Sequence, residues 1–368
     1  MPHISRRRWL AGAGASLGGA WASGCATLAA PPSTGGGACL PRVNVDPSRL
    51  IRAVAGLRPY RAEGFVVREE ALGATRLVHN YGHGGSGITL SWGTSMLAAE
   101  LGLRGHSGPV AVLGAGVVGL STARLVQEAG FPVTIYAAAL PPDTTSNVAG
   151  GQFHPFGHFR EDRVTPAWRE QFRRALDYSW RRFQIMVGDE YGVRWLPTYS
   201  ESDEVEARVI PAFPPINRFM ARDEHPFPVE NLIRYDTLYV ETGRYLRQML
   251  RDVRVHGGEI EVRRLADREA IAALPERLVF NCTGLGAGAL FGDAGIQPVR
   301  GQLAVLLPQP EVRYAFTGEA GYMFPRADGI LLGGTFERGV WDTNPNPARI
   351  ARILERHQRF WSAMRCTT

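Results

Sequence analysis

The chain contains no lysine, so all 41 of its basic residues are arginines. This absence indicates a compositional bias rather than a binding surface. Outside the first ten residues no run of basic residues with interleaved aromatic residues occurs, which argues against a nucleic-acid-binding protein. The formal net charge of +6 includes Arg6, Arg7 and Arg8, which lie in a segment typical of a removable leader. We therefore expect no nucleic-acid partner.

The chain also lacks a long hydrophobic run and an internal repeat. The mildly apolar stretch that ends near Ala22 is too short and too rich in small residues for a stable membrane span. Low complexity is confined to Ala29–Gly37, which predicts a flexible tether. With 368 residues, 45% hydrophobic and 21% charged, the remainder has the composition of a globular protein and sufficient length for two domains.

The first 25 residues carry export signals. Ser5–Leu10 (SRRRWL) resembles a twin-arginine signal, and residues 22–25 (ASGC) resemble a lipoprotein cleavage box. Residues 1–24 are therefore expected to be a signal peptide and residues 25–40 a tether. Two outcomes stay open, an acylated Cys25 or simple cleavage into the periplasm. In either case we expect a periplasmic or other extracytoplasmic protein, with membrane contact only through a lipid anchor at Cys25.

A dinucleotide fingerprint, VAVLGAGVVGLSTA, begins at Val110. The apolar run Val110–Leu113 predicts a buried parallel strand, Leu120–Ala129 keeps a helical apolar period, and Val133–Tyr136 predicts a second strand. Between the first strand and the helix, three glycines allow the tight turn, the approach of the backbone to a pyrophosphate and close helix–strand packing: Gly114, Gly116 and Gly119. The N-terminus of the helix would then face the phosphates.

Two more segments have a readable pattern. Apolar residues recur near the helical period over Gln171–Val187, which predicts a long helix. Ser200–Asp236 is rich in proline and is expected to form loops or a sheet edge. Short apolar strands alternating with amphipathic helices indicate an α/β or α+β protein.

Six separated segments resemble the FAD-dependent D-amino-acid oxidase family. They are GLRPYR (Gly56–Arg61), HNYGHGGSG (His79–Gly87), TTSNVAGG (Thr144–Gly151), VFNCTGLGA (Val279–Ala287), PVRGQ (Pro298–Gln302) and YMFPRADGILLGGTF (Tyr322–Phe336). The resemblance covers most of residues 41–361. It implies an α/β fold with a Rossmann-type FAD-binding domain and a mixed α+β substrate domain.

The order of these segments departs from the family. GLRPYR and HNYGHGG close the family's chain, whereas here they precede the fingerprint, which predicts a circularly permuted order. The helix expected over Ala348–Trp361 would then lead in space into Val45–Leu57, and Gly102–Pro109 would join the old ends. The predicted FAD-binding domain comprises 62–148 and 240–303, and the predicted substrate domain comprises 41–61, 149–239 and 304–368.

The resemblance implies a substrate site. Arg58 stands where the family binds the substrate carboxylate, and Tyr322 matches a family tyrosine that contacts the same group. His154 stands near the expected flavin face, where it would influence specificity or support neighbouring groups. Gly318 departs from the family, which often has a lid tyrosine there, and Tyr314 and Phe316 are potential substitutes.

The resemblance also implies FAD-binding residues. Consecutive glycines allow backbone N–H groups to approach the flavin ring. The expected contacts are Gly84, Gly85, Ser86, Gly87, Ile88, Thr89, Gly114, Ala115, Gly116, Val117, Val118, Gly119, Thr144, Thr145, Ser146, Gly151, Gln152, Leu265 and Thr283. One departure is the run Ala137-Ala138-Ala139, which replaces the acidic residue that usually binds the adenosine ribose. We expect FAD to be held more weakly or differently at that end, and we do not expect NAD.

Four cysteines are present. Cys282 follows an apolar run and is expected in the core. Under the permuted order, Cys39 and Cys366 flank the new chain ends, so a disulfide between them is predicted, with two free thiols as the alternative. His79 and His83 stand four residues apart, but the glycines around them do not favour a helix and no HExxH motif is formed. We expect no metal site.

The sequence therefore predicts an enzyme that oxidises a D-amino acid by hydride transfer from its α-carbon to FAD. The imino acid would hydrolyse to a keto acid and ammonia, and oxygen would be reduced to hydrogen peroxide. A quinone acceptor stays open for an anchored protein. The alternatives are a D-aspartate-type or glycine/sarcosine-type amine oxidase and a non-catalytic flavin-binding lipoprotein.

Overall fold

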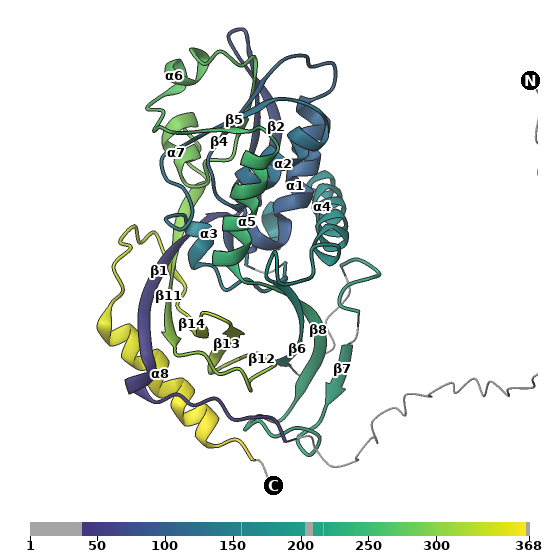
Figure 1. Cartoon of the computed structure of the whole chain (residues 1–368). Helices are drawn as coiled ribbons and strands as arrows, with labels where there is room; N and C mark the ends of the chain where they lie inside the picture. Colours follow the sequence, from purple (N-terminus) through teal and green to yellow (C-terminus); the bar gives the residue numbers. More distant parts are fainter. Residues whose placement is uncertain (1–38, 156, 203–208, 216, 366–368) are drawn as a thin grey trace, which may run out of the picture. The chain divides into compact units, whose positions relative to one another are not determined.

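The computed structural model describes residues 39–155, 157–202, 209–215 and 217–365 (Figure 1). The predicted export signal, the candidate lipidation site Cys25, the predicted tether over Ala29–Gly37 and Cys366 lie outside these residues. Within the described part, two β-sheets and the helices that cover them form the fold. No helix among the described residues is long and apolar enough to cross a membrane.

The smaller sheet has six strands and holds the predicted fingerprint strand. β4 covers Val110–Leu113, as predicted, and β5 covers Val133–Ala137, one residue longer than predicted. Both are fully or largely buried and pair in parallel, as hydrophobic strands covered on two faces do. The strand order is β2 (Val66–Leu72), β3 (Thr75–Tyr81), β10 (Leu278–Asn281), β4, β5 and β9 (Glu259–Val262).

Helices cover both faces of this sheet (Figure 1). One large core joins it to α1 (Gly87–Gly102), α2 (Val117–Glu128), α4 (Pro166–Gln184) and α5 (Thr242–Val255). A smaller core joins its other face to α6 (Arg268–Ala272) and α7 (Gly286–Phe291). This arrangement is a doubly wound α/β layer, with α2 directly after the fingerprint turn.

The larger sheet has nine strands and forms the second layer. Its order is β1 (Leu50–Arg61), β11 (Ile296–Leu306), β14 (Gly329–Gly333), β13 (Gly321–Arg326), β12 (Ala315–Gly318), β6 (Val193–Glu201), β8 (Leu232–Val240) and β7 (Asn217–Met220), with β15 (Glu337–Arg338) beside β11. Helix α8 (Pro347–Ser362) packs on this sheet, and its Trp361 is buried against Phe316 of β12. The short elements are α3 (Thr145–Val148) and three 3₁₀ turns, Pro47–Arg49, Gly84–Ser86 and Glu161–Arg163.

Two predicted elements differ from the structure. The helix expected over Gln171–Val187 is α4, which begins at Pro166 because Thr165 accepts a hydrogen bond from the Trp168 N–H and caps it. The expectation of loops or a sheet edge over Ser200–Asp236 agrees with β7, the edge strand, but is wrong at its end, since β8 begins at Leu232 and pairs with β6 along its whole length. The prolines of this stretch lie between residues 211 and 228, so they do not interrupt β8.

The predicted domain boundaries can be compared with the sheets and hydrophobic cores of the structure. β11 runs through the boundary expected after residue 303 and lies entirely in the larger sheet. α4, expected with the substrate domain, packs in the core around α1 of the smaller sheet. The helix expected over Ala348–Trp361 is α8, one residue longer at each end.

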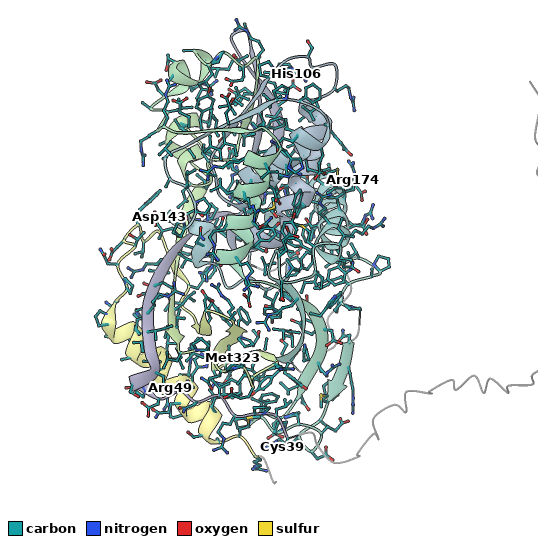
Figure 2. All side chains as sticks on the ribbon, in the orientation of Figure 1. Cys39, Arg49, His106, Asp143, Arg174 and Met323 are labelled. Carbon is teal, nitrogen blue, oxygen red and sulfur yellow. The ribbon has the colours of Figure 1, made fainter. Side chains whose placement is uncertain are left out.

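The two ends of the described chain meet. Arg42 donates a hydrogen bond from Nη2 to the carbonyl oxygen of Met364, at 2.9 Å. Figure 2 shows Cys39 at the end of the molecule where α8 ends in Figure 1. Cys39 is disulfide-bonded, to a partner outside the described residues, so the pairing with Cys366 stays a prediction. Cys282 is free and buried, as predicted, and burial raises the pKa of its thiol to about 12.

Candidate functional site

A cavity of about 1390 Å³ lies between the two sheets and is lined by residues of both. Its walls include the turn after β4, the loop after β5 and the pocket face of β1, β12 and β13. Asp143, labelled in Figure 2, lies on the loop after β5 and lines this cavity. The volume exceeds that of a typical small-ligand pocket and leaves room for a dinucleotide and a substrate together.

The fingerprint turn has a backbone that only glycine permits at two positions. Gly114 has a φ of 104°, and a Cβ there would lie 2.6 Å from the Cys282 carbonyl oxygen. A Cβ on Gly119 would lie 1.9 Å from the Gly114 carbonyl oxygen, so this glycine lets α2 pack on the turn. α2 begins at Val117 with no side-chain cap on Gly116, which leaves a positive helix end at the cavity.

The segment before α1 forms a second glycine wall. Gly84, Gly85, Gly87 and Ile88 line the cavity. Gly84 has a φ of 52°, and a Cβ there would lie 2.9 Å from the carbonyl oxygen of Gly157. The backbone at this wall is therefore accessible to a flat ring, as the pyrimidine end of a flavin requires. Together with the positive end of α2, this wall fits FAD.

Thr144, Thr145, Ser146, Gly151, Gln152, Leu265 and Thr283 also line the cavity, as do Ala115, Gly116, Val117 and Val118. Three predicted cofactor residues do not line it, namely Gly119, Ser86 and Thr89. Gly119 lies behind the turn. Ser86 shares a hydrogen bond with His158 Nδ1 at 3.2 Å, and Thr89 bonds to the backbone of His154. These two hydroxyls lie behind the cavity wall.

Ala137, Ala138 and Ala139 line the cavity at the end of β5, where the sequence indicated that the usual acidic residue is missing. This end of the cavity is also lined by Arg263 and Arg264, which follow β9; the Arg263 N–H donates to the Ala137 carbonyl at 2.8 Å. The acid that would bind the ribose hydroxyls in a typical site is therefore replaced by a methyl group beside two guanidinium groups.

The substrate end is built around Arg58 of β1 and Tyr322 of β13, both of which line the cavity. The Arg58 guanidinium lies over Gly301, where a Cβ would be 2.4 Å from Nη1 and Nη2. Arg58 also donates from Nη1 to the Thr335 carbonyl at 3.3 Å, and no carboxylate among the described residues pairs with its guanidinium. Burial raises the pKa of the Tyr322 hydroxyl, against the effect of the neighbouring Arg58 charge.

Tyr322 is fixed by its packing. Its ring stacks on Phe324 with centroids 4.6 Å apart and planes at 18°. On the neighbouring strand β14, a Cβ at Gly333 would lie 1.9 Å from Tyr322 Cζ, so only glycine fits beneath the ring. The side chain is thus held in one place, with its hydroxyl beside Arg58.

His154 lines the cavity beside Tyr235, with ring centroids 6.3 Å apart. Its backbone N–H donates to Thr89 Oγ1 at 3.0 Å, and Thr89 Oγ1 donates to its carbonyl at 3.1 Å. The buried Thr89 therefore fixes the segment that carries His154. The structure brings His154, Arg58 and Tyr322 to one cavity, as expected.

The interpretation of Gly318 changes. A Cβ there would lie 2.4 Å from Glu201 Oε2, so the position faces Glu201 rather than the cavity. Tyr314 and Phe316 do not substitute for a lid aromatic, because both are buried in the core with α8. The cavity-facing residue of this strand is Thr317.

Sequence reasoning missed several other lining residues: Ser200, Tyr235, Gly301, Thr317, Phe336 and Trp341. Ser200, Thr317 and Tyr322 lie on three strands that pair side by side, although they are far apart in sequence. The alternation of buried and cavity-facing residues in Tyr199-Ser200 and Phe316-Thr317 is the signal that would have found two of them.

The two histidines of HNYGH have structural contacts. His79 Nε2 lies 3.0 Å from Glu70 Oε2 and its Nδ1 lies 3.0 Å from Asn281 Nδ2. His83 Nε2 lies 2.8 Å from Thr94 Oγ1. Within the described ranges, no group of three or more metal-ligating side chains occurs.

Comparison with known proteins identifies the family. The sequence profile described as FAD dependent oxidoreductase matches residues 35–101 and 109–367. The chain belongs to this family. It is an FAD-dependent oxidoreductase of the amino-acid oxidase type, and the predicted family, α/β fold and cofactor are confirmed.

This FAD-dependent oxidoreductase resembles curated relatives over about two thirds of its length. D-amino-acid oxidase of Streptomyces coelicolor is 32% identical over 278 residues, which cover 68% of this chain and 77% of the relative. D-amino-acid oxidase of Rubrobacter xylanophilus is 31% identical, over 67% and 74% of the two chains. Human D-aspartate oxidase is 29% identical, also over 67% and 74%.

Solved structures show the same fold. Glycine oxidase from Geobacillus kaustophilus superposes with a TM-score of 0.52 over 70% of this chain and 80% of that one, at 16% identity. Glycine oxidase from Bacillus cereus gives 0.51 over 68% and 77%, at 17% identity. At such identities the likeness establishes the fold of this oxidoreductase and not its substrate.

Proposed function

We propose that this oxidoreductase converts a D-amino acid to the imino acid, which water hydrolyses to a keto acid and ammonia. The substrate loses hydride from Cα and a proton from nitrogen, and oxygen takes up the two electrons and two protons to give hydrogen peroxide. FAD, when bound, supplies the two-electron acceptor between them. The names of the relatives from Streptomyces and Rubrobacter support this choice of substrate.

The observation that carries the proposal is the pair Arg58 and Tyr322 at the wall of the FAD cavity. Arg58 presents a planar fork that matches a carboxylate, and the described residues give it no carboxylate partner. The raised pKa of Tyr322 keeps its hydroxyl protonated, so it donates to the same carboxylate. The two groups fix the substrate by its carboxylate and leave Cα to be turned toward the glycine wall.

The other residues of the site position the reacting groups and do not take part in the reaction. Gly301 and Gly333 leave room for the Arg58 fork and the Tyr322 ring, and Thr89 fixes the backbone of His154. Loss of hydride from Cα needs a neutral amine with a free lone pair and no obligatory protein base. The intact anchor and glycine walls also argue against a binding protein without activity.

The test is anaerobic. The mature protein with FAD is mixed with matched D- and L-amino acids while the flavin absorbance is recorded, and air is then admitted. Bleaching by D- but not L-enantiomers, followed by recovery of colour with one hydrogen peroxide per imino acid, supports the proposal. Bleaching by L-enantiomers would contradict the proposed substrate. Recovery of colour only with an added quinone would contradict oxygen as the acceptor.

We also propose that the chain is a circular permutation of its family. The profile matches in two blocks that are interrupted at 102–108, where the chain passes from α1 to β4. The contact of Arg42 with Met364 brings the two described ends together. A gene rearranged to encode residues 108–368, a short linker and residues 39–101 should yield a folded protein with the same flavin spectrum. Failure to fold would contradict the permutation.

We propose export by the twin-arginine route, supported by residues 5–10 and by the disulfide at Cys39. Replacing all of Arg6, Arg7 and Arg8 with lysine should retain the protein in the cytoplasm, and Cys25→Ser should release it from membranes if the anchor is present. A Cys39–Cys366 bond predicts at most two free thiols in the unreduced mature protein, Cys25 and Cys282, and only one where Cys25 is acylated. Unchanged export of the lysine variant would contradict the route.

A further inference from the structure

The larger sheet carries a row of polar side chains away from the carboxylate anchor. In register, Tyr322 of β13 lies opposite Thr317 of β12, and Thr317 lies opposite Ser200 of β6. All three line the cavity. Neighbouring strands are about 4.8 Å apart, so the row extends roughly 10 Å from the Tyr322 backbone. A substrate that is held by Arg58 and Tyr322 therefore has Thr317 and Ser200 beside its side chain.

The opposite face of the same strands is filled. Tyr199 and Phe316 alternate with Ser200 and Thr317 and are buried in the core with α8. Because side chains alternate along a strand, the two hydroxyl-bearing residues are committed to the cavity face. The polar row is thus a fixed feature of the cavity wall and not a flexible surface.

The two hydroxyl groups have no partner among the described residues. Thr317 Oγ1 is shielded from solvent and unbonded, and no hydrogen bond from the side chain of Ser200 is found in the described part of the chain. Because Thr317 lines the cavity, we expect rotation about χ1 to bring this hydroxyl to a bound ligand. A shielded hydroxyl is satisfied only when a ligand supplies the missing partner.

The far end of the row is also polar and uncharged. Tyr235 of β8 lines the cavity there, and its hydroxyl accepts a hydrogen bond from Gln152 Nε2 at 3.4 Å. Its ring lies beside His154. The far end therefore offers further hydrogen-bonding groups to a substrate with a longer side chain.

No second arginine occurs among the described residues that line the side-chain region of the cavity. Among the described cavity-lining residues, the permanent cations are Arg58, Arg263 and Arg264. Arg58 is taken by the α-carboxylate, and the other two lie beside Ala137 of the smaller sheet. The cavity-lining Asp293 is already paired with Arg61, at 2.8 Å. A carboxylate on the substrate side chain would thus lose its hydration without meeting an opposite charge.

We propose that the row of Thr317 and Ser200 receives the substrate side chain and selects uncharged side chains with a hydroxyl or carboxamide group. This assignment rests on the proposed oxidation of D-amino acids. It ranks D-serine above its apolar isostere D-2-aminobutyrate, and D-asparagine above both D-leucine and D-aspartate. A preference for D-aspartate, the substrate named for the human relative, is therefore not expected here.

The test compares matched substrate pairs in the FAD-loaded enzyme. Thr317→Val and Ser200→Ala each remove one hydroxyl with little change in shape. We expect each to lower the kcat/KM ratio of D-serine to D-2-aminobutyrate, or of D-asparagine to D-leucine, by about 3- to 10-fold. The apolar member of each pair should be unaffected. Ratios that stay the same in both variants, or a wild type that favours D-leucine over D-asparagine, would overturn the proposal.

Thr198→Val is the matched control. Thr198 lies on β6 two residues before Ser200, does not line the cavity and shares a hydrogen bond with Tyr239 at 3.1 Å. Its loss should lower stability and leave the substrate ratios unchanged. A change in the ratios equal to that of Ser200→Ala would assign the effect to general loosening of the strand.

A binding measurement separates this proposal from the proposed reaction. 3-Hydroxypropanoate and butanoate are the amine-free counterparts of D-serine and D-2-aminobutyrate, and neither can be oxidised as an amino acid. Perturbation of the flavin absorbance should show tighter binding of 3-hydroxypropanoate, with the difference lost in the two variants. Equal binding of both acids contradicts the polar row. Selective binding without turnover of any D-amino acid supports the row and contradicts the proposed reaction.

Discussion

The guanidinium of Arg58 occupies the space that a side chain at Gly301 would need. A Cβ on Gly301 would lie 2.4 Å from both terminal nitrogens of Arg58. The two residues belong to β1 and β11, which pair antiparallel along the whole of β1. The carboxylate anchor is therefore placed by the strand pairing and by the absence of one methyl group.

Gly301→Ala should displace the Arg58 fork without unfolding the protein, because the atoms in the way are the end of a flexible side chain. A displacement of this size costs about 100-fold in kcat/KM, while the affinity for FAD stays the same. Steady-state kinetics with a D-amino acid and a flavin titration measure the two effects. Gly243→Ala, in the first turn of α5, is the control and should change neither. A Gly301→Ala enzyme with normal kinetics would show that Arg58 does not set the substrate position.

Ala138→Asp should tighten the binding of FAD. The acidic residue that binds the ribose hydroxyls is absent beside Ala137, and an aspartate there would supply charge-assisted hydrogen bonds. We expect a Kd for FAD about 10-fold lower, measured by quenching of flavin fluorescence on titration into apoprotein. Ala139→Asp, at the next exposed position, is the comparison. Equal affinities in the wild type and both variants would mean that Arg263 and Arg264 already satisfy the adenosine end.

Three buried histidines make the protein labile to acid. Burial lowers the pKa of His83 and of His158 to about 3 and that of His357 to about 4. The unfolded chain takes up a proton at each near pH 6.5, whereas the folded protein does not. The free energy of unfolding should therefore be greatest above pH 6.5 and fall by about 1.4 kcal/mol per pH unit for each histidine, down to pH 3–4.

Urea denaturation between pH 7 and pH 5 measures this slope. His158→Phe removes one proton-binding site and should make the slope shallower, although the loss of the hydrogen bond to Ser86 lowers stability at pH 7. An unchanged slope in His158→Phe would contradict the assignment to buried histidines.

Local pattern predicted the nucleotide-binding half well. Val110–Leu113 is apolar throughout, and the spacing of Gly114 and Gly119 specifies the turn and the helix packing. These signals are local, so they can be recognised in the sequence without knowledge of the fold. The start of α4 was missed because it depends on a cap by Thr165, and β8 because its partner β6 lies more than thirty residues earlier.

The substrate half could be predicted only in part. The resemblance to a family pointed to Arg58 and Tyr322, which the structure brings to one cavity. Thr317 and Ser200 were missed because the pairing of β6 with β12 is parallel and joins residues more than one hundred positions apart. The prediction of Tyr314 and Phe316 as substitutes for a lid aromatic is wrong because their burial depends on packing against α8, which lies far along the chain.

The most direct test of the account is the rate of anaerobic flavin bleaching by D-alanine in the wild type and in Arg58→Ala. Both proteins are first loaded with FAD and shown to have the same absorbance spectrum. We predict that removing the guanidinium costs about 2–5 kcal/mol, a loss of roughly 30- to 5000-fold in the second-order rate constant. An Arg58→Ala protein that is bleached as fast as the wild type would contradict the role of Arg58 as the carboxylate anchor.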